Sequence, residues 1–274
     1  AMGDLVITLP YLQQLRNMLP AGTRLDLLTR KEVRAIPENM HLFNRVYSIG
    51  GGRNTKKQLV FTVLLIPFLF LKGYEVVIDL QDNIISRLVT KCMMPQASSL
   101  FDRLSDAPAG ERTKQTIEAI GLGPCFAVNK FKLLNEAEGI RILQQHGWKT
   151  GYGLLVLNPA GAFETRNWGL DNYVRFARLW LKRFPKTQIL IMGTSFIAAK
   201  SDYLSEKLKG QCINLVNKTT PAQAFAIMQR VRFVLSEDSG LMHMAWVSGI
   251  PTMALFGSTQ SKKARPLGRN SLFV

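Results

Sequence analysis

A group of polar residues follows one buried strand pattern near the C-terminal end of the chain. The segment LSEDSGLMH, residues 235–243, places Asp238, Ser239 and Gly240 in a turn and His243 on the helix that follows. A helix start offers free N–H groups and partial positive charge, glycine permits close approach, and His243 shares a helix face with Ser239. The turn could therefore bind a phosphate. The alternative is structural: Asp238 or Ser239 caps the helix, and His243 is a buried histidine bonded to backbone.

Three other polar turns could also carry chemistry. Arg166 lies in a loop between a strand and a helix, and its guanidinium could form a fork with phosphate oxygens. Asp4 precedes a helix expected to start near residues 8–10, and it could accept a proton from a hydroxyl group. A turn after a strand end could bind a sugar through Asp79, Gln81, Asn83, Ser86 and Arg87. Each turn also has a structural interpretation, as an exposed arginine, a turn aspartate or a capped turn.

The elements that must position these turns alternate between strand and helix patterns. Eight short apolar runs without strict polar alternation predict parallel strands covered on both faces. They are 24–28, 46–49, 76–80, 154–157, 188–192, 213–215, 233–236 and 252–256. Helical patterns lie between them, including Asp171–Phe184 with a 3.6-residue apolar stripe and a helix opened by Pro221 after Thr219 and Thr220. This alternation predicts an α/β fold with doubly wound sheets, whose ligands bind beyond the carboxyl ends of the strands.

The length of 274 residues fits two such domains. The segment Gln144–Gly153, with three glycines, separates a helix pattern from a fresh strand. We therefore predict one domain over residues 1–148 and a second over 149–274, with the polar turns of both at an interdomain cleft. Such a cleft is the usual position of an enzyme site.

The charge balance favours anionic partners. The chain has 35 Lys and Arg against 19 Asp and Glu, a net charge of +16, spread over both halves. Such a field suits nucleotides, nucleic acid or an anionic membrane surface. No basic stripe interleaved with aromatic residues is present, which argues against nucleic acid. The three cysteines and three histidines are scattered without zinc spacing, so we expect no metal site and a reducing compartment.

One long apolar run, Leu59–Leu71, is too short to span a bilayer. Lys56, Lys57 and Lys72 flank it, and Pro67 interrupts it. Two interpretations stay open: a helix buried on a sheet, or an interfacial helix that rests on a membrane with its lysines at the headgroups.

Four blocks of the sequence resemble the ADP-heptose:lipopolysaccharide heptosyltransferase family, glycosyltransferase family 9, and they occur in the family's order. They are GDLVITLPYLQQLR, YEVVIDLQDNIISR, NPAGAFETRNWGLDNYVRFA and SEDSGLMHMAWVSGIPTMALFGST. The last resembles the family's D-S/T-G-x-x-H block, followed by small residues, a proline and an L-F/Y-G end. The resemblance implies the GT-B fold, with two Rossmann-like domains that face a cleft.

The resemblance also implies an activity: inverting, metal-independent transfer of heptose from ADP-heptose to the lipopolysaccharide inner core, with the ADP-sugar as donor substrate and no cofactor. It implies that Asp4 is the base for the acceptor hydroxyl, and that Arg166 with the Ser239–Gly240 helix end stabilises the leaving diphosphate. Asp238 would hold sugar hydroxyls, His243 would orient the loop or the diphosphate, and adenine would lie near residues 217–220. The full expected substrate-binding set is Gly3, Gln81, Asn158, Gly161, Thr219, Asp238, Ser239, Gly240 and His243.

The chain departs from the family pattern at both ends. Family members normally begin with a strand before Gly-Asp and continue past the L-F-G block, so we expect the first N-terminal strand and the C-terminal end to be lacking. Because that strand is central, we also expect a gap in the N-terminal core. Arg166 stands where some members have lysine. Two alternatives remain: a GT-B glycosyltransferase for another nucleotide sugar, or a truncated nucleotide-binding form without activity.

The expected partners and location follow from the same resemblance. They are ADP-heptose and the anionic lipopolysaccharide core acceptor, with no nucleic acid. The expected location is the cytoplasm, with peripheral contact with the cytoplasmic face of the inner membrane as an option.

Overall fold

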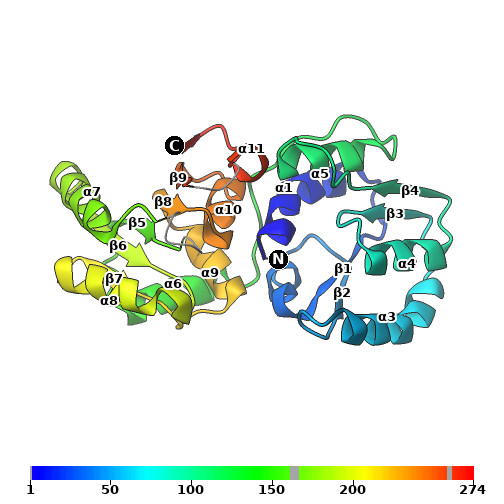
Figure 1. Ribbon diagram of the computed structural model, residues 1–274, viewed down its shortest axis with the longest axis horizontal. Coiled ribbons are helices and arrows are strands. Elements are labelled where there is room, and N and C mark those ends of the chain that lie inside the picture. The colour runs from blue at the N-terminus through cyan, green and yellow to red at the C-terminus, as the bar shows by residue number, and fades with distance from the viewer. Residues whose placement is uncertain (1, 161–166, 258–260) are drawn as a thin grey trace. The chain divides into compact units, whose positions relative to one another are not determined.

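The structure, a computed structural model, describes residues 2–160, 167–257 and 261–274. The chain divides into two units, unit 1 over residues 1–128 and unit 2 over residues 129–274. Strands and helices alternate in both units, and every strand pair among the described residues is parallel (Figure 1). The expected α/β class is confirmed.

Unit 1 contains two separate pairs of parallel strands, β1–β2 and β3–β4. The strands are β1 (Asp26–Arg30), β2 (Arg45–Ile49), β3 (Val76–Asp79) and β4 (Ala97–Leu100). The helices are α1 (Met2–Met18), η1 (Lys31–Val33), α2 (Ala35–Glu38), α3 (Thr55–Phe70), α4 (Ile84–Met93) and α5 (Ala109–Glu118). Helix α1 packs against α5, and α3 packs against α4.

A cavity of about 690 Å³ separates the two strand pairs of unit 1. Consecutive residues of β3 line it from Val76 to Asp79, and consecutive residues of the β1 region line it from Arg24 to Leu28. Because neighbouring strand residues point to opposite faces, a consecutive lining means that the backbone edges of both strands border the cavity. The two strand pairs of unit 1 are thus not joined into one sheet.

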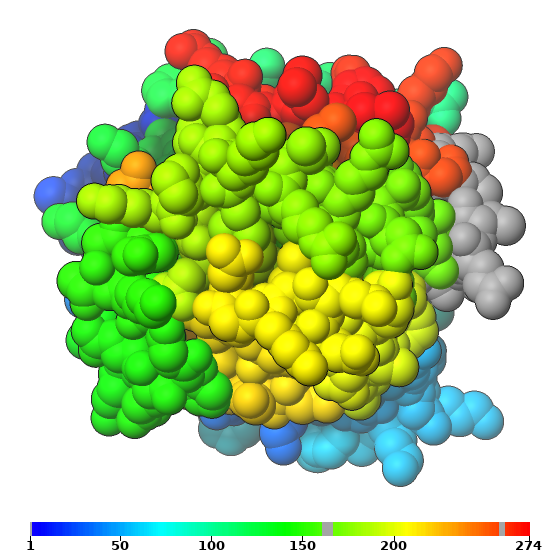
Figure 2. Space-filling model, turned by 90° about the vertical axis from the view of Figure 1, so that its left-hand side faces the viewer, coloured from blue at the N-terminus to red at the C-terminus, as the bar shows by residue number. Residues whose placement is uncertain are grey.

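Unit 2 contains one six-stranded parallel sheet in the order β10-β9-β8-β5-β6-β7. The strands are β5 (Gly153–Asn158), β6 (Thr187–Ile191), β7 (Cys212–Asn214), β8 (Phe233–Glu237), β9 (Thr252–Leu255) and β10 (Ser271–Phe273). The helices are α6 (Glu136–Gln145), α7 (Leu170–Arg183), η3 (Ser195–Ile197), α8 (Ala198–Lys207), α9 (Pro221–Met228), α10 (Gly240–Val247) and α11 (Ser261–Ala264). Figure 2 shows α7 and α8 side by side over one face of the unit.

The sheet of unit 2 is covered on both faces. Leu155 and Leu157 of β5 join the cluster formed with α7 and α8, and Leu154 and Val156, which point the other way, are also fully buried. The predicted apolar stripe of α7 is confirmed, since Tyr173, Val174, Ala177 and Leu181 are its buried residues. Burial on both faces explains why these strands are continuously apolar in sequence.

The strand predictions agree with the structure for all eight segments, with ends that differ by up to two residues. The sequence analysis missed β4 and β10. It was wrong about the first helix, because α1 begins at Met2 and not near residues 8–10. Proline usually opens a helix because its missing N–H costs nothing there, yet Pro10 lies inside α1, where it gives up the hydrogen bond to Val6.

The predicted domain boundary at 148/149 lies about twenty residues beyond the division at 128/129. Helix α6 packs on α9 and thus belongs to unit 2. Two glycines of the predicted linker, Gly147 and Gly151, have positive φ and form the loop from α6 to β5 inside that unit. They therefore mark a turn and not a link between domains.

The apolar run Leu59–Leu71 forms most of α3, and in that helix only Thr62 and Leu69 are buried. The interpretation of a helix buried on a sheet is half right: Leu65, Ile66 and Leu69 pack with strand residues, but most of the run is exposed. Among the helices of the described residues, none has the length and apolar character needed to cross a membrane.

Candidate functional site

A buried hydrogen-bond cluster joins the ends of two neighbouring strands in unit 2. Asn158 ends β5, and its side-chain Nδ2 donates to Ser236 Oγ at 2.8 Å and to Ser239 Oγ at 2.6 Å. The pairing of β5 with β8 places Asn158 directly opposite Ser236. Asn158 is fully buried, and its Oδ1 has no hydrogen-bond partner among the described residues. The cluster fixes the turn that leads from β8 into α10.

Ser239 caps α10. Its backbone is extended, and its Oγ accepts the N–H of Met242 at 3.3 Å. The capping interpretation is therefore confirmed for Ser239, and the same geometry leaves the N–H groups of the first turn, beginning at Gly240, at the carboxyl edge of the sheet. Asp238 and Gly240 are partly exposed at this edge. An anion could bind here, because helix starts attract negative charge.

His243 is buried on α10 and receives a hydrogen bond from a side chain. The Nε1–H of Trp246 donates to His243 Nδ1 at 3.1 Å. In this arrangement Nδ1 carries the lone pair, so the proton of a neutral imidazole lies on Nε2. The expectation of a buried histidine is confirmed, and one hydrogen bond to its ring comes from an indole.

Glu237 is a buried carboxylate that the sequence analysis did not include in the site. Its Oε1 accepts the backbone N–H of Trp168 at 2.8 Å, which ties the β5–α7 loop to the end of β8. The Trp168 ring meets Tyr173 edge-on, with centroids 5.3 Å apart. Burial raises the pKa of Tyr173 well above its usual value, and the negative charge of Glu237 raises it further. Tyr173 therefore stays a neutral phenol beside the site.

Lys200 is a second residue that the sequence analysis missed. Its Nζ donates to the carbonyl of Pro159 and to Oδ1 of Asn167, both at 2.9 Å. In the sequence, one of these two acceptors precedes residues 161–166 and the other follows them. Two predicted site residues, Gly161 and Arg166, belong to that segment and lie outside the described residues.

The loop after β7 lies beside the loop after β6. The backbone N–H of Asn217 donates to the carbonyl of Gly193 at 2.9 Å, and Asn217 has φ of 59°. Thr219 is half-buried next to this turn. Thr220 caps α9, with a reciprocal capping box to Gln223, as the sequence predicts for the start of this helix.

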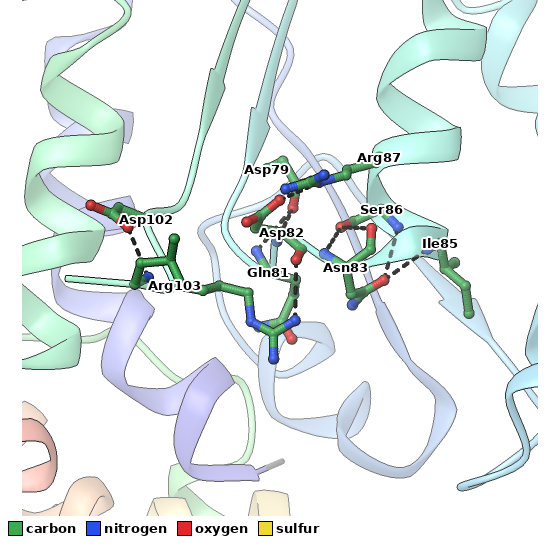
Figure 3. Close-up of polar contacts among 10 residues, drawn as sticks. Asp79, Gln81, Asp82, Asn83, Ile85, Ser86, Arg87, Asp102 and Arg103 are labelled. Carbon is green, nitrogen blue, oxygen red and sulfur yellow. Dashed lines mark hydrogen bonds and ion pairs between the residues drawn. The ribbon is translucent and has the colours of Figure 1, made fainter. Parts of the chain in front are cut away.

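In unit 1, the turn after β3 is organised by its own polar residues (Figure 3). Asp79 Oδ1 accepts the backbone N–H groups of Gln81 and Asp82, each at 2.9 Å. Asn83 and Ser86 form a capping box at the start of α4. The interpretation of a capped turn is confirmed, and Gln81 is exposed on it.

Two arginines reach the same turn. Arg87 forms an ion pair with the Asp82 carboxylate, and Arg103 Nη1 donates to the Asp82 carbonyl at 3.3 Å. The Arg87 guanidinium lowers the pKa of Asp82. Asp79 is buried, and its Oδ2 has no hydrogen-bond partner within the described part of the chain.

Gly3 and Asp4 lie in the first turn of α1, where Asp4 is exposed. Its negative charge suits a helix start. The structure thus gathers Asn158, Asp238, Ser239, Gly240 and His243 at one edge of unit 2. Unit 1 carries Gly3, Asp4 and Gln81. Among the described residues, no three His, Cys, Asp or Glu side chains come together as metal ligands.

The sequence comparisons with known proteins point to one family. The sequence model of glycosyltransferase family 9 (heptosyltransferase) matches residues 124–274. A lipooligosaccharide heptosyltransferase 2 of Haemophilus influenzae is 34% identical over 71 residues, 26% of this chain and 20% of that protein. Its namesake in Campylobacter jejuni is 33% identical over 128 residues, 43% of this chain and 38% of that protein. The matches therefore span less than half the length of these curated relatives.

Solved structures share the fold at low sequence identity. A glycosyltransferase family 9 protein of Veillonella parvula has a TM-score of 0.86 at 15% sequence identity. The match covers 100% of this chain and 83% of the Veillonella chain. ADP-heptose lipopolysaccharide heptosyltransferase II of E. coli has a TM-score of 0.77 at 17% identity, with 100% and 87% coverage. These likenesses confirm the fold of two Rossmann-like units. Because the family model covers more than half of it, the chain belongs to glycosyltransferase family 9, the heptosyltransferase family.

Proposed function

We propose that this chain acts as a heptosyltransferase that moves heptose from ADP-heptose to the inner core of lipopolysaccharide, with inversion and without a catalytic metal. Family membership and the names of the curated relatives support this proposal. A solved structural neighbour, the E. coli heptosyltransferase WaaC, is described with ADP. The observation that carries the proposal is the capped start of α10 at the carboxyl edge of unit 2, where Asn158 and Ser239 are joined by a 2.6 Å hydrogen bond.

On the donor side, the backbone N–H groups at the start of α10, beginning at Gly240, would bind the diphosphate. The Ser239 cap fixes their orientation, and they carry the positive end of the helix dipole. Asp238 would accept hydrogen bonds from sugar hydroxyls, and Thr219 would border the adenine. We further propose that Gly161 and Arg166 complete the phosphate contacts. Asn158 and His243 are buried, so we assign them to holding the turn and α10 in position.

On the acceptor side, Asp4 would take the proton of the attacking hydroxyl, and Gly3 and Gln81 would contact the acceptor. Asp4 is exposed, as a base that meets a second substrate must be. The net charge of +16 would attract the anionic acceptor. We propose the cytoplasmic face of the inner membrane as the place of reaction.

The first test is calorimetric titration of the chain with ADP, UDP and GDP in EDTA. We expect saturable ADP binding that is at least about tenfold tighter than that of UDP or GDP, and a further loss with Ser239→Ala, because the cap that orients the phosphate site is removed. Thr194→Ala serves as the matched control, since Thr194 precedes a helix without capping it.

Each other result has a definite meaning. A preference for UDP would replace ADP-heptose by another nucleotide sugar. ADP binding without transfer to a lipopolysaccharide acceptor would identify a nucleotide-binding form without activity. If ADP binding required a divalent metal, the metal-independent part of the proposal would be wrong.

A further inference from the structure

Helix α3 of unit 1 has an inner and an outer face, and both are apolar. The inner face carries Leu65, Ile66 and Leu69, which pack with Val89 and Met93 of α4. The same cluster includes Leu28, Tyr47 and Val77 of the strands, so α3 is attached to its unit by contacts with both α4 and the strands. Figure 1 shows α3 at the rim of unit 1, with α4 and the strands of the unit on one side of it.

The outer face of α3 is a continuous apolar stripe. Its residues follow the spacing of three and four that defines one side of a helix, and each is between 54% and 81% exposed. They are Val60, Val63, Leu64, Phe68 and Leu71. Leu59, Phe61 and Phe70 widen the stripe at its borders and are also exposed. Scattered apolar side chains are ordinary on protein surfaces, but a contiguous stripe of this kind marks a contact surface.

The charges on α3 and directly beside it in the sequence have one sign. Between Glu38 and Glu75 the sequence has no acidic residue, and its basic residues are Arg45, Arg53, Lys56, Lys57 and Lys72. Lys56 and Lys57 lie in the first turn of α3, and Lys72 follows its end; all three are exposed. The neighbouring α4 also lacks acidic residues and carries Arg87 and Lys91. The apolar stripe is therefore bounded by positive charge at both ends.

We propose that the outer face of α3 docks on an anionic phospholipid bilayer, with the helix lying in the plane of the membrane surface. Apolar side chains of an interfacial helix enter the boundary between headgroups and acyl chains. Lysines at its ends extend their ammonium groups to the lipid phosphates, and each strengthens binding to an anionic surface. The apolar stripe thus matches the acyl-chain boundary of an anionic bilayer, and the lysines match its headgroup phosphates.

A second copy of the chain fits this surface less well. Two stripes packed together would bring lysines of one helix near lysines of the other, because Lys56, Lys57 and Lys72 occupy both ends of α3. Parallel and antiparallel pairing both place like charges close together, which opposes association. Anionic lipid removes this repulsion.

The test is flotation of the full chain with vesicles of phosphatidylcholine alone and with about one third phosphatidylglycerol. We expect binding to the anionic vesicles, and an affinity at least about tenfold lower for the triple variant Leu64→Gln, Phe68→Gln, Leu71→Gln. Replacing Lys56, Lys57 and Lys72 by Gln should weaken binding about fivefold per residue and reduce its sensitivity to salt. Phe68→Trp should show a blue-shifted emission that brominated lipid quenches.

The matched control is Leu179→Gln with Phe196→Gln, two exposed apolar residues of unit 2 on α7 and η3. It should bind vesicles like the unchanged chain, and all variants should keep the same circular dichroism because the replaced side chains are exposed. Absence of anionic-lipid binding, or equal binding by the stripe variant, would overturn the proposal. So would a concentration-dependent dimer that the stripe variant abolishes without any vesicle binding. The inference concerns unit 1 alone, and nucleotide affinity, measured separately, tests the proposed activity.

Discussion

Asn158 and Asp4 represent two kinds of polar residue in this protein. Asn158 is fully buried, and its amide nitrogen donates hydrogen bonds to Ser236 and Ser239. It can therefore affect ligand binding only through the turn that these bonds hold in place. Asp4 is exposed in the first turn of α1. Only a residue of the second kind can meet a substrate hydroxyl directly, which makes Asp4 the residue to test for proton transfer.

We predict that Asp4→Asn lowers kcat by about 10²–10⁴-fold, because an amide cannot accept the acceptor's proton in the transition state. The affinity for ADP should stay within about twofold, since the proposed diphosphate site lies on unit 2. A coupled assay of ADP release and a calorimetric titration measure the two effects. Glu38→Gln, a change of another carboxylate in unit 1, is the control; undiminished turnover by Asp4→Asn would remove Asp4 as the base.

At this scale the sequence predicts the residues but not their partners. Asp238, Ser239, Gly240 and His243 stand out because a run of polar residues after an apolar strand is a local signal. Glu237 belongs to the same polar run, but its contact with Trp168 and those of Lys200 cannot be seen from sequence, because they join residues 69 and 41 positions apart in the chain. Such contacts depend on the order of strands in the sheet, which a single sequence does not display.

At the scale of elements, helix starts are set by single side chains. Thr220 accepts the N–H of Gln223, and the Gln223 side chain bonds back to the N–H of Thr220, so two of the unpaired donors of α9 are satisfied. Pro221 at the first position of the helix adds no unpaired donor. These features sit together in sequence, which is why this helix start could be predicted.

We predict that Thr220→Ala destabilises unit 2 by about 1 kcal/mol, the usual value of a lost cap, and lowers its melting temperature by about 3 °C. Thr194→Ala should change it by less than about 0.5 kcal/mol, because Thr194 makes no capping hydrogen bond. Thermal unfolding followed by circular dichroism distinguishes the two. Equal effects of both substitutions would contradict a role of the capping box.

The two strands that the sequence analysis missed are short and little buried. The central strands β5, β6 and β8 are buried along nearly their whole length. In contrast, β4 reads ASSL, and only Ser99 of it is buried. Similarly, β10 has three residues and lies at the end of its sheet. Strands that bury so little surface carry no apolar run, so composition does not mark them.

At the scale of the molecule, the two units differ in how completely their strands are joined. Unit 2 has one continuous sheet of six strands, whereas unit 1 has two strand pairs with a cavity of about 690 Å³ beside them. Asp26 Oδ1 and Asp79 Oδ2 around that cavity have no hydrogen-bond partner among the described residues. Cavities and unsatisfied buried polar atoms both lower stability.

We therefore predict two transitions in differential scanning calorimetry, with unit 1 unfolding first. ADP at about 100 times its Kd should stabilise the second transition by about 2.7 kcal/mol and leave the first nearly unchanged, because the proposed site lies on unit 2. A single transition that shifts as a whole on adding ADP would show that the units unfold together, contrary to this expectation.

The division between the units was the least predictable feature from sequence. Glycines at 147 and 151 resemble a linker, but they serve a tight turn inside unit 2. The division falls before α6, because α6 packs on α9, a helix that is distant from it in the sequence. Gly139 of that helix lies against Ala226 of α9 so closely that an added Cβ would stand 3.1 Å from the Ala226 Cβ.

The packing of α6 on α9 has a practical consequence for dissecting the protein. A C-terminal half cut at residue 149 would lose Glu138, which accepts from Gln223 at 2.7 Å, and would uncover the apolar side of α9. It would also lose Asn129, whose Nδ2 donates to the carbonyl of Val247 at 2.7 Å and satisfies the end of α10. A fragment beginning at or before Asn129 keeps both contacts. Helix α6, which the sequence analysis assigns to the first domain, therefore covers part of the core of unit 2.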